Sequence, residues 1–219
     1  MSDAPLTIAV PRGALFKGTL ELLDAIGIGT AEVRANDRRL VFPELGIVTM
    51  RPSDVPTYVE AGAADVGITG KDVLTEQDER KIVEVLDLGY GGCRMVLATI
   101  ETPPGRPDPA SEALRRLGVM RVATKYPRIC SRYFERTGRQ AEIVEVKGSV
   151  ELAPVTGLVE AIVDLTATGR TLQENGLVVR EEIMSSTARL IANPVSYKLK
   201  AAAIDDLTAK MRAAREVVA

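Results

Sequence analysis

The sequence of 219 residues contains no histidine. It can therefore form neither a Ser-His-Asp nor a Cys-His triad, and it offers no imidazole to bind a metal ion or to carry a proton. The two cysteines, Cys93 and Cys130, are isolated and fit no metal-ligand spacing, so we expect small core residues rather than a disulfide. Any chemistry that this chain performs therefore has to manage without imidazole.

The sequence also has no large excess of acidic or of basic residues. The chain has 28 basic and 30 acidic residues, mixed along the sequence, and a net charge of −2. This balance excludes a global electrostatic footprint for nucleic acid, so any anion site must be local. Long apolar runs are also lacking, and residues 1–5 contain no basic segment that leads into an apolar one. These features predict a cytoplasmic protein that neither spans a membrane nor is exported.

Short strand-like and helix-like segments alternate along most of the chain, which is typical of an α/β protein with largely parallel sheets. The length is enough for one large domain or two small ones. The expected strands cover residues 7–10, 40–42, 47–50, 65–69, 83–88, 95–100, 122–124, 143–146, 162–165 and 187–192. The expected helices cover residues 15–26, 53–61 with Ser53 as the N-cap, 110–117, 128–136 and 172–175, and a long helix begins near Ser196.

Two stretches bear on domain organisation. Residues 102–109 are rich in proline, and we expect the chain to cross between domains in this region. The second domain then spans about residues 99–180. In the C-terminal helix, apolar residues recur by threes and fours, which favours packing against its own domain over an exposed partner seam. This stripe consists of Ile204, Leu207, Met211, Ala214 and Val218.

One segment, residues 161–172, combines an apolar strand, a carboxylate and a turn with several hydroxyls. Backbone N–H groups at such a turn converge on an anion, Gly169 lets the main chain approach a phosphate, and threonine hydroxyls add donors. Asp164, at the end of the strand, can accept hydrogen bonds from ribose hydroxyls. The sugar-phosphate site on this hypothesis consists of Asp164, Thr166, Ala167, Thr168, Gly169, Arg170 and Thr171. An ordinary strand-to-helix turn capped by Thr168 stays open as the alternative.

The residues around this turn lengthen the motif. Residues 151–157 (Glu-Leu-Ala-Pro-Val-Thr-Gly), together with Ile162, Asp164, Leu165, Thr168, Gly169, Thr171 and Leu172, resemble the signature of the ATP phosphoribosyltransferase family. The similarity extends over nearly the whole chain, through residues 8–15, 38–42, 51–59, 64–72, 121–126 and 193–197. It implies transfer of phosphoribosyl from phosphoribosyl pyrophosphate to N1 of ATP with release of pyrophosphate, the first step of histidine biosynthesis. Such a transfer needs no imidazole, because N1 of adenine already carries a lone pair.

The resemblance also implies a fold. Members of this family have two α/β lobes with a central cleft, in a periplasmic-binding-protein-like arrangement, and their C-terminal tail returns to the first lobe. Residues 1–98 and 181–219 are then expected to form the first lobe. Residues 99–180 are expected to form the second lobe, which carries the phosphoribosyl pyrophosphate loop.

Matching motifs supply further candidate site residues. Arg12, Arg38 and Arg39 are predicted to be catalytic, because the resemblance implies contacts with the nucleotide and the leaving group. Where the family usually has Pro-Lys-Gly-Arg, this chain has Arg12 in place of the lysine and Ala14 in place of the arginine, a departure at one expected phosphate contact. For any arginine taken alone, a solvated surface charge is the ordinary interpretation. The other predicted substrate-binding residues are Arg51, Thr69, Gly70, Lys71 and Glu151.

The resemblance bears on cofactors and partners too. Mg²⁺ is expected to arrive with the polyphosphate substrates, so no metal-ligating residues are predicted. The chain resembles the short form of the family, a catalytic subunit that works with a regulatory subunit resembling histidyl-tRNA synthetase, as a homodimer within a hetero-oligomer. Two other functions stay open: a non-catalytic two-lobe module that binds small anions, and a nucleobase-salvage phosphoribosyltransferase.

Overall fold

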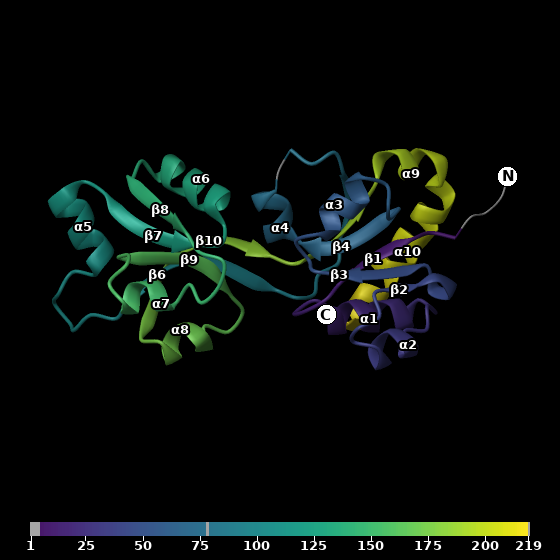
Figure 1. Ribbon diagram of the computed structural model, residues 1–219, viewed down its shortest axis with the longest axis horizontal. Coiled ribbons are helices and arrows are strands. Elements are labelled where there is room, and N and C mark those ends of the chain that lie inside the picture. Colours follow the sequence, from purple (N-terminus) through teal and green to yellow (C-terminus); the bar gives the residue numbers. More distant parts are fainter. Residues whose placement is uncertain (1–4, 78, 219) are drawn as a thin grey trace. The chain divides into compact units, whose positions relative to one another are not determined.

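The structure is a computed structural model in which residues 5–77 and 79–218 are described. The chain forms two α/β units, residues 1–92 with 187–219 and residues 93–186 (Figure 1). The boundaries expected from the sequence, after residues 98 and 180, fall inside β6 (Cys93–Ile100) and β10 (Leu177–Ser186). These two strands pair with each other along their length, so both belong wholly to the second unit.

The first unit is built on a six-stranded sheet with the order β2-β3-β1-β4-β11-β5. β1 pairs parallel with β3 and β4, whereas the other pairs of this sheet are antiparallel. The strands are β1 (Ile8–Pro11), β2 (Val41–Phe42), β3 (Ile47–Met50), β4 (Val66–Gly70), β5 (Val83–Asp87) and β11 (Ala188–Ala192). The helices are α1 (Phe16–Ala25), α2 (Ala31–Ala35), α3 (Val55–Glu60), α4 (Lys71–Glu76), α9 (Pro194–Leu199) and α10 (Ala201–Val218), with a 3-10 helix at Pro43–Leu45.

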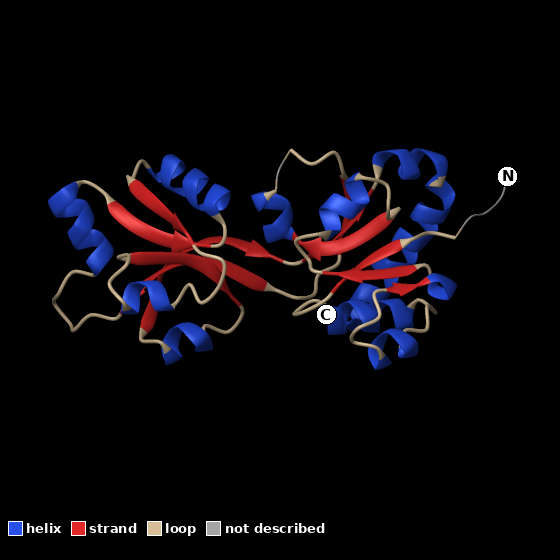
Figure 2. Cartoon of the chain, viewed as in Figure 1, coloured by secondary structure: helices blue, strands red, loops and turns tan. Residues whose placement is uncertain are grey.

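Helices cover both faces of this sheet because its central strands are apolar on both sides (Figure 2). Successive residues of a strand point to opposite faces. Ile8 and Val10 therefore pack into a core with α1 and α10, while Ala9 packs on the other face with Val55 and Val59 of α3. The parallel strands β1, β3 and β4 are thereby held side by side in a three-layer unit.

The C-terminal stripe packs as expected. Ile204, Leu207 and Met211 of α10 are buried in the core of the first unit, against α1. Full burial of an aliphatic side chain contributes about 1.5–3 kcal/mol, so α10 is an integral part of this unit. Val218, the last member of the stripe, lies outside the described side chains, as do residues 1–4 of the N-terminal segment.

Two helix starts differ from the expectation. Ser53 does not cap α3, because the N-cap is Asp54 and the Ser53 hydroxyl donates to the Asp54 carboxylate instead. The long helix expected from Ser196 is two helices, α9 and α10. The Asn193 side chain caps α9 by accepting from the N–H groups of Val195 and Ser196, at 2.8 and 2.9 Å.

The second unit has a five-stranded sheet in the order β10-β6-β9-β7-β8. β7 pairs parallel with β8 and β9, while β6 pairs antiparallel with β9 and β10. Both sheets are mixed, so the expectation of largely parallel sheets was wrong. The remaining elements are β7 (Met120–Thr124), β8 (Ala141–Glu145), β9 (Ala161–Thr166), α5 (Pro109–Leu117), α6 (Pro127–Thr137), α7 (Leu152–Val155) and α8 (Arg170–Glu174).

The helices of this unit also divide between two faces. Residues of α5 and α6 share a core with Met95, Leu97 and Val163, whereas residues of α7 and α8 share a core with Val96 and Ile162. We refer to the second of these as the α7/α8 face. The alternation along β6 and β9 therefore assigns each of their residues to one of two environments.

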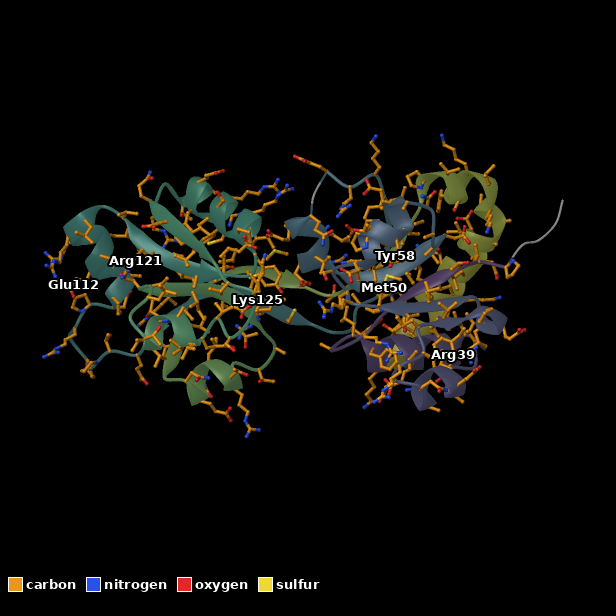
Figure 3. All side chains as sticks on the ribbon, viewed as in Figure 1. Arg39, Met50, Tyr58, Glu112, Arg121 and Lys125 are labelled. Atoms are coloured by element: carbon orange, nitrogen blue, oxygen red, sulfur yellow. The ribbon has the colours of Figure 1, made fainter. Side chains whose placement is uncertain are left out.

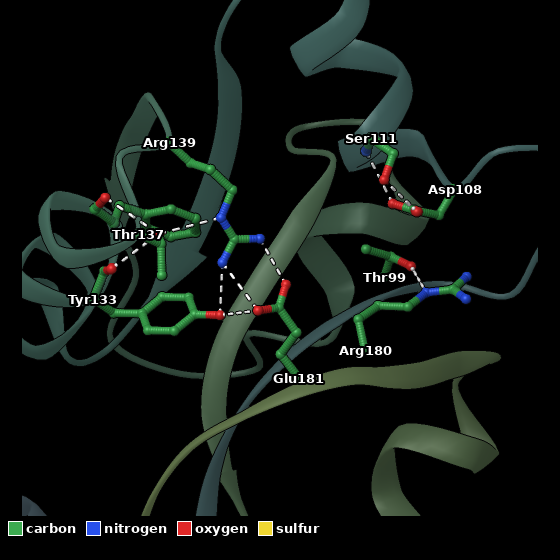
Figure 4. Close-up of polar contacts among 9 residues, drawn as sticks. Thr99, Asp108, Ser111, Tyr133, Thr137, Arg139, Arg180 and Glu181 are labelled. Carbon is green, nitrogen blue, oxygen red and sulfur yellow. Dashed lines mark hydrogen bonds and ion pairs between the residues drawn. The ribbon is translucent and has the colours of Figure 1, made fainter.

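β10, the longest strand in the described part of the chain, was not predicted from the sequence. Its centre, Arg180 to Glu182, is charged, and polar contacts bind it to the rest of the unit (Figure 4). Arg139 donates to the Glu181 carboxylate at 2.6 Å and to the Tyr133 oxygen at 2.6 Å, and Tyr133 donates to the same carboxylate. Arg180 donates to Thr99 at 2.8 Å. The charged residues of β10 thus attach this strand to α6 and β6.

The proline-rich residues 102–109 do not cross between the units. They connect β6 to α5 inside the second unit, and Asp108 ends the segment by capping α5 through the Ser111 N–H at 3.0 Å. The first crossing instead follows Tyr90, where Gly91 has a φ of 68° and a Cβ would lie 2.3 Å from a Leu15 side-chain carbon. The left-handed backbone favours glycine there, whereas the nearby leucine carbon is the end of a flexible side chain that can shift.

Candidate active site

The loop after β9 is held together by its own threonines. The Thr166 hydroxyl oxygen accepts from the Gly169 N–H at 2.8 Å, and the Thr168 oxygen accepts from the Arg170 N–H at 3.3 Å. A hydroxyl that accepts in this way still has its own hydrogen to donate. The loop therefore presents two oriented O–H donors next to the start of α8.

Gly169 supplies the backbone conformation of this loop. Its φ is 79°, in the left-handed region, and it is the N-cap of α8, which begins at Arg170. A Cβ at this position would meet no other atom of the chain within 4 Å. Backbone geometry, and not packing within the chain, is what requires glycine here. The expected helix start at Leu172 and the expected cap at Thr168 are both replaced by this earlier start.

Alternation places the polar end of β9 on the α7/α8 face. Ile162 is buried there, so Asp164 and Thr166 lie on the same face two and four residues further along. Leu165, between them, packs with the core of the opposite face. The predicted carboxylate and the first threonine of the loop are thus brought together by strand geometry alone.

Lys125 joins Asp164 at the carboxyl ends of two parallel strands, β7 and β9 (Figure 3). Its ammonium nitrogen lies 3.8 Å from Asp164 Oδ2, with side-chain exposures of 37% for the lysine and 11% for the aspartate. Lys125 was not among the predicted site residues. The signal that could have found it is its position directly after a strand that runs parallel to β9, since ligands bind outside such strand ends.

The charge on Asp164 depends on its surroundings. Burial raises the pKa of the Asp164 carboxyl, and the Glu151 carboxylate raises it further, whereas Lys125 and the Leu165 N–H lower it. The net effect is a pKa above the usual value of an aspartate. Glu151 is the N-cap residue of α7 and is half-buried, so this predicted residue also lies in reach of Asp164 electrostatically.

In the first unit, predicted residues follow the carboxyl ends of three neighbouring parallel strands. Arg12 follows β1, Arg51 follows β3 and Lys71 follows β4. Pro11 is in register with Met50, and the Arg12 N–H donates to the Met50 carbonyl at 2.7 Å. Cationic side chains from distant parts of the sequence are therefore gathered at one edge of this sheet.

Arg12 and Arg39 are engaged in holding this edge together. The Arg12 guanidinium donates to Thr49 Oγ1 at 3.0 Å and to the carbonyls of Asn36 and Arg39 at 3.1 and 2.8 Å. Arg39, labelled in Figure 3, pairs with Glu32 and donates to the Val41 carbonyl at 2.9 Å. Both guanidiniums thus fix the segment from Asn36 to Val41 against the sheet.

Arg38 and Arg51 are exposed cations. Within residues 5–77 and 79–218, neither side chain has a hydrogen bond or an ion pair to another part of the chain. Arg38 lies between the two residues whose carbonyls Arg12 holds, and Arg51 follows the carbonyl that binds the Arg12 N–H. Two guanidiniums without a partner among the described residues are therefore available to an anion.

The three predicted residues at the end of β4 have partners within the chain. Thr69 is fully buried and its hydroxyl donates to the Pro52 carbonyl at 2.8 Å. A Cβ on Gly70 would lie 2.1 Å from Asp72 Oδ1. Lys71 pairs with Glu84 at 2.6 Å. The buried Thr69 hydroxyl thus has a structural partner, and the half-exposed Lys71 lies at the edge of the site.

Neither a membrane-spanning helix nor a cluster of metal-ligating side chains is found in the described part of the chain. Over residues 5–77 and 79–218, no helix is both long and apolar enough to cross a membrane. The same residues contain no group of three or more Cys, Asp or Glu side chains that could hold a metal ion.

Comparison with known proteins gives the family. A family model described as ATP phosphoribosyltransferase matches residues 51–213. An ATP phosphoribosyltransferase from Rubrobacter xylanophilus is 55% identical over 208 residues, which cover 94% of each chain. The solved ATP phosphoribosyl transferase (HisG:HisZ) complex from Thermotoga maritima aligns with a TM-score of 0.76 and 36% identity, over 97% of this chain and 99% of that chain.

A more distant likeness concerns the fold alone. The substrate-binding protein of an amino acid ABC transporter aligns with a TM-score of 0.55 and 13% identity, over 91% of this chain and 82% of its own. The predicted α/β fold of the periplasmic-binding-protein kind is confirmed. The family match includes Arg51 and the loop after β9, whereas Arg12, Arg38 and Arg39 precede it. With this match and identity over nearly its full length, the chain belongs to the ATP phosphoribosyltransferase family, and the predicted enzyme class, a pentosyltransferase, is confirmed.

Proposed function

We propose that this chain transfers the phosphoribosyl group of phosphoribosyl pyrophosphate to N1 of ATP, with release of pyrophosphate, as the first step of histidine biosynthesis. The observation that carries the proposal is the loop after β9. Its threonine hydroxyls are oriented by the backbone, and a carboxylate and a lysine stand beside it. A phosphorylated sugar needs this combination: donors for the phosphate and an acceptor for the ribose hydroxyls.

In this proposal the second unit binds the sugar phosphate. The hydroxyls of Thr166, Thr168 and Thr171 donate to the 5′-phosphate at the start of α8, and ionised Asp164 accepts from the ribose hydroxyls. Lys125 favours the ionised form of Asp164, which its burial opposes. Glu151, near enough to affect the same carboxyl, accepts from a further ribose hydroxyl.

The first unit contributes the cations in this proposal. Arg38 and Arg51, which have no partner in the described part of the chain, bind the phosphates of ATP and of the leaving pyrophosphate. Arg12 and Arg39 are positioning residues that hold the segment carrying Arg38, and Lys71 adds charge at the same edge. Thr69 and Gly70 shape the end of β4. Because Arg38 and Arg51 bind the phosphates in this proposal, no guanidinium is needed at position 14, where this chain has alanine.

The chemistry follows from these roles. The bond between the anomeric carbon and the pyrophosphate oxygen breaks, its electron pair leaves with pyrophosphate, and the N1 lone pair of adenine forms the new bond. No proton has to be removed from N1 for bond formation. Alignment of two substrates contributes up to about 7–11 kcal/mol to such a reaction, and cations at the leaving group add electrostatic stabilisation.

Mg²⁺ fits the residues present. It is commonly bound by one or two carboxylates together with substrate phosphates, and Asp164 and Glu151 are two interacting carboxylates beside the loop. When bound, the ion would neutralise polyphosphate charge. In this proposal it arrives with the substrates, and Asp164 or Glu151 would be the residue that helps to hold it.

The partner follows from a solved relative. The Thermotoga maritima structure is a complex of HisG with HisZ, and this chain aligns with 99% of the matched chain. We extend that assembly to this protein: homodimers of the catalytic chain join a HisZ-type regulatory subunit that resembles histidyl-tRNA synthetase. We place the assembly in the cytoplasm, as for other biosynthetic enzymes that consume ATP.

The test is the reaction itself. Purified chain, with and without a HisZ-type subunit, is mixed with ATP, phosphoribosyl pyrophosphate, Mg²⁺ and pyrophosphatase, and the absorbance of N1-substituted adenine is followed. Formation of this chromophore confirms the reaction and the acceptor together. Product with a free nucleobase in place of ATP would instead identify a salvage enzyme. Binding of phosphoribosyl pyrophosphate without any transfer would identify a non-catalytic module.

A further inference from the structure

One cation beside the sugar-phosphate loop has no role in the function proposed above. Arg94 is the second residue of β6, and it lies directly opposite Thr166 in the antiparallel pair of β6 and β9. Directly opposed residues point to the same face, with Cβ atoms about 4.5–5.5 Å apart. Arg94 therefore shares the α7/α8 face with Thr166, the first residue of the loop.

The register of the two strands places this arginine in a polar row. Val96, two residues further along β6, is buried on the α7/α8 face and opposes Asp164. Along this face, Asp164 is therefore level with Val96, and the next opposed pair is Thr166 with Arg94. Arg94 thus lies on the strand at one side of β9, with its guanidinium paired to Glu182 of β10, while Lys125 follows the strand at the other side, beside Asp164.

The present partner of Arg94 is easily exchanged. Its Nη1 lies 3.2 Å from Oε2 of Glu182 on β10, and the two side chains are 45% and 46% exposed. Ion pairs this exposed are weak, because water screens them. A phosphate monoester carries up to two negative charges and three oxygens, and it can accept two parallel bonds from a guanidinium.

The other cations near the loop are placed differently. Lys125 faces the Asp164 carboxylate, so its charge is largely offset. Arg170 is 81% exposed and bonds along its own helix to Glu174 at 2.8 Å. Arg94 combines a fixed strand position next to Thr166 with a partner that solvent weakens.

We propose that Arg94 binds the 5′-phosphate of phosphoribosyl pyrophosphate together with the loop after β9, and that Glu182 is its counterion when no phosphate is bound. The proposal rests on the function proposed above, since it adds a residue to the same sugar-phosphate site. Substrate binding then moves the guanidinium from one acceptor, Glu182, to another, the phosphate.

The experiment measures binding and turnover in parallel. Dissociation constants of phosphoribosyl pyrophosphate and of ribose 5-phosphate are obtained by calorimetry for wild type, Arg94→Ala, Arg94→Lys and Glu182→Gln. Arg115→Ala and Glu112→Gln are matched controls, because this pair is also an exposed ion pair in the second unit, on α5. The KM for ATP is measured wherever the chain turns over.

The expected result is specific to the sugar phosphate. Loss of a charge-assisted, bidentate contact in Arg94→Ala raises both dissociation constants about 10- to 100-fold, with the KM for ATP unchanged. Arg94→Lys, which keeps the charge and loses the fork, falls in between. Glu182→Gln, which removes the competitor, binds both ligands a few-fold more tightly. The α5 controls bind as wild type does.

Two outcomes would overturn the proposal. Unchanged constants in Arg94→Ala would show that the arginine does not reach the ligand. Weaker binding of phosphoribosyl pyrophosphate with unchanged binding of ribose 5-phosphate would place Arg94 on the pyrophosphate instead. Failure of the proposed function looks different, since it abolishes transfer to ATP in wild type while the binding measurements still decide the role of Arg94.

Discussion

The two units use charge in different ways at the carboxyl ends of their parallel strands. In the second unit, the polar groups around the loop after β9 come from one short segment and its neighbouring strands, and the loop is ordered by its own threonine hydroxyls. In the first unit, the cations come from four separate segments, which carry Arg12, Arg38 with Arg39, Arg51 and Lys71. Arg12 and Arg39 are used to hold those segments together, whereas Arg38 and Arg51 stay exposed.

This difference teaches how far a local motif reaches. A phosphate-binding loop can be predicted from sequence because its glycine and its hydroxyl-bearing residues lie within a few positions of one another. The role of each arginine in a cluster is not predicted in the same way, since a guanidinium binds either a substrate phosphate or a backbone carbonyl. Four predictions test the contrast, from the largest expected effect to the smallest.

Gly169→Val should reduce kcat/KM for phosphoribosyl pyrophosphate about 100-fold or more. A β-branched residue is strained at a φ of 79°, and a shift of the loop by about 1 Å is enough for such a loss. Steady-state kinetics with circular dichroism provides the measurement. Gly138→Val, at the end of α6 with a φ of 68°, is the matched control for backbone strain. Equal kinetics in the two variants would contradict the role of the loop.

Asp164→Asn should lower kcat/KM for phosphoribosyl pyrophosphate about 10- to 100-fold, because the ribose hydroxyls lose a charged acceptor. It should also make the fold more stable at neutral pH. Burial, with Glu151, raises the folded pKa of this carboxyl above the unfolded value of 3.8, against Lys125 and the Leu165 N–H. Folding therefore stabilises the neutral acid, and stability falls as the pH rises from 3.8 through the folded pKa. Urea unfolding at neutral pH measures the gain.

Asp65→Asn, in the first unit, is a control for which we expect the opposite change in stability. Burial raises the pKa of Asp65, but Lys200, the Thr7 N–H and the Ser196 hydroxyl together lower it below 3.8. The ionised form therefore stabilises this unit above pH 3.8, and that stability is lost as the pH falls through the folded pKa. The variant should lose about 2 kcal/mol at neutral pH with unchanged kinetics. The same sign of stability change in both aspartate variants would refute the comparison.

Arg12→Ala and Arg38→Ala should separate structure from binding in the first unit. Loss of the hydrogen bonds from Arg12 to Asn36, Arg39 and Thr49 should lower the free energy of unfolding by about 2 kcal/mol. Arg38→Ala should leave stability unchanged and raise the KM for ATP about 10-fold. Chemical unfolding and initial rates measure the two effects. A destabilised Arg38 variant with normal kinetics would reverse the assignment.

Lys125→Met and Glu151→Gln should shift the acid limb of the pH profile in opposite directions. Lys125 lowers the pKa of Asp164 and Glu151 raises it, and Asp164 must be ionised to accept from ribose. The limb of kcat/KM for phosphoribosyl pyrophosphate therefore moves to higher pH without the lysine and to lower pH without the glutamate charge. Lys147→Met, at an exposed lysine of the same unit, should leave the limb in place. Shifts in one direction would argue against this coupling.

Much of the fold was predictable because its strands are apolar and short. Segments such as β1, β3, β4 and β9 were found within one or two residues, since burial on both faces leaves a continuous apolar run. β10 was missed because Arg180, Glu181 and Glu182 interrupt its apolar pattern, and the partners that justify these charges lie far along the chain. The proline-rich residues 102–109 were misread because composition marks a surface loop without saying what it connects.

The sequence by itself indicated the family, through a resemblance that extends over nearly the whole chain, and the α/β class, through the alternation of strand-like and helix-like segments. It also predicted a phosphate-binding loop after β9, from the spacing of residues within one short segment. The tertiary structure decided which cations are free. Lys125 approaches Asp164 only because β7 and β9 pair in parallel, and Arg94 approaches Thr166 only because β6 pairs with β9 in one register. Arg12 holds the segment from Asn36 to Arg39 because folding brings the carbonyls of these two residues within hydrogen-bond distance of its guanidinium. Charge interactions depend on distance and burial, and both are set by contacts between residues that the sequence keeps apart.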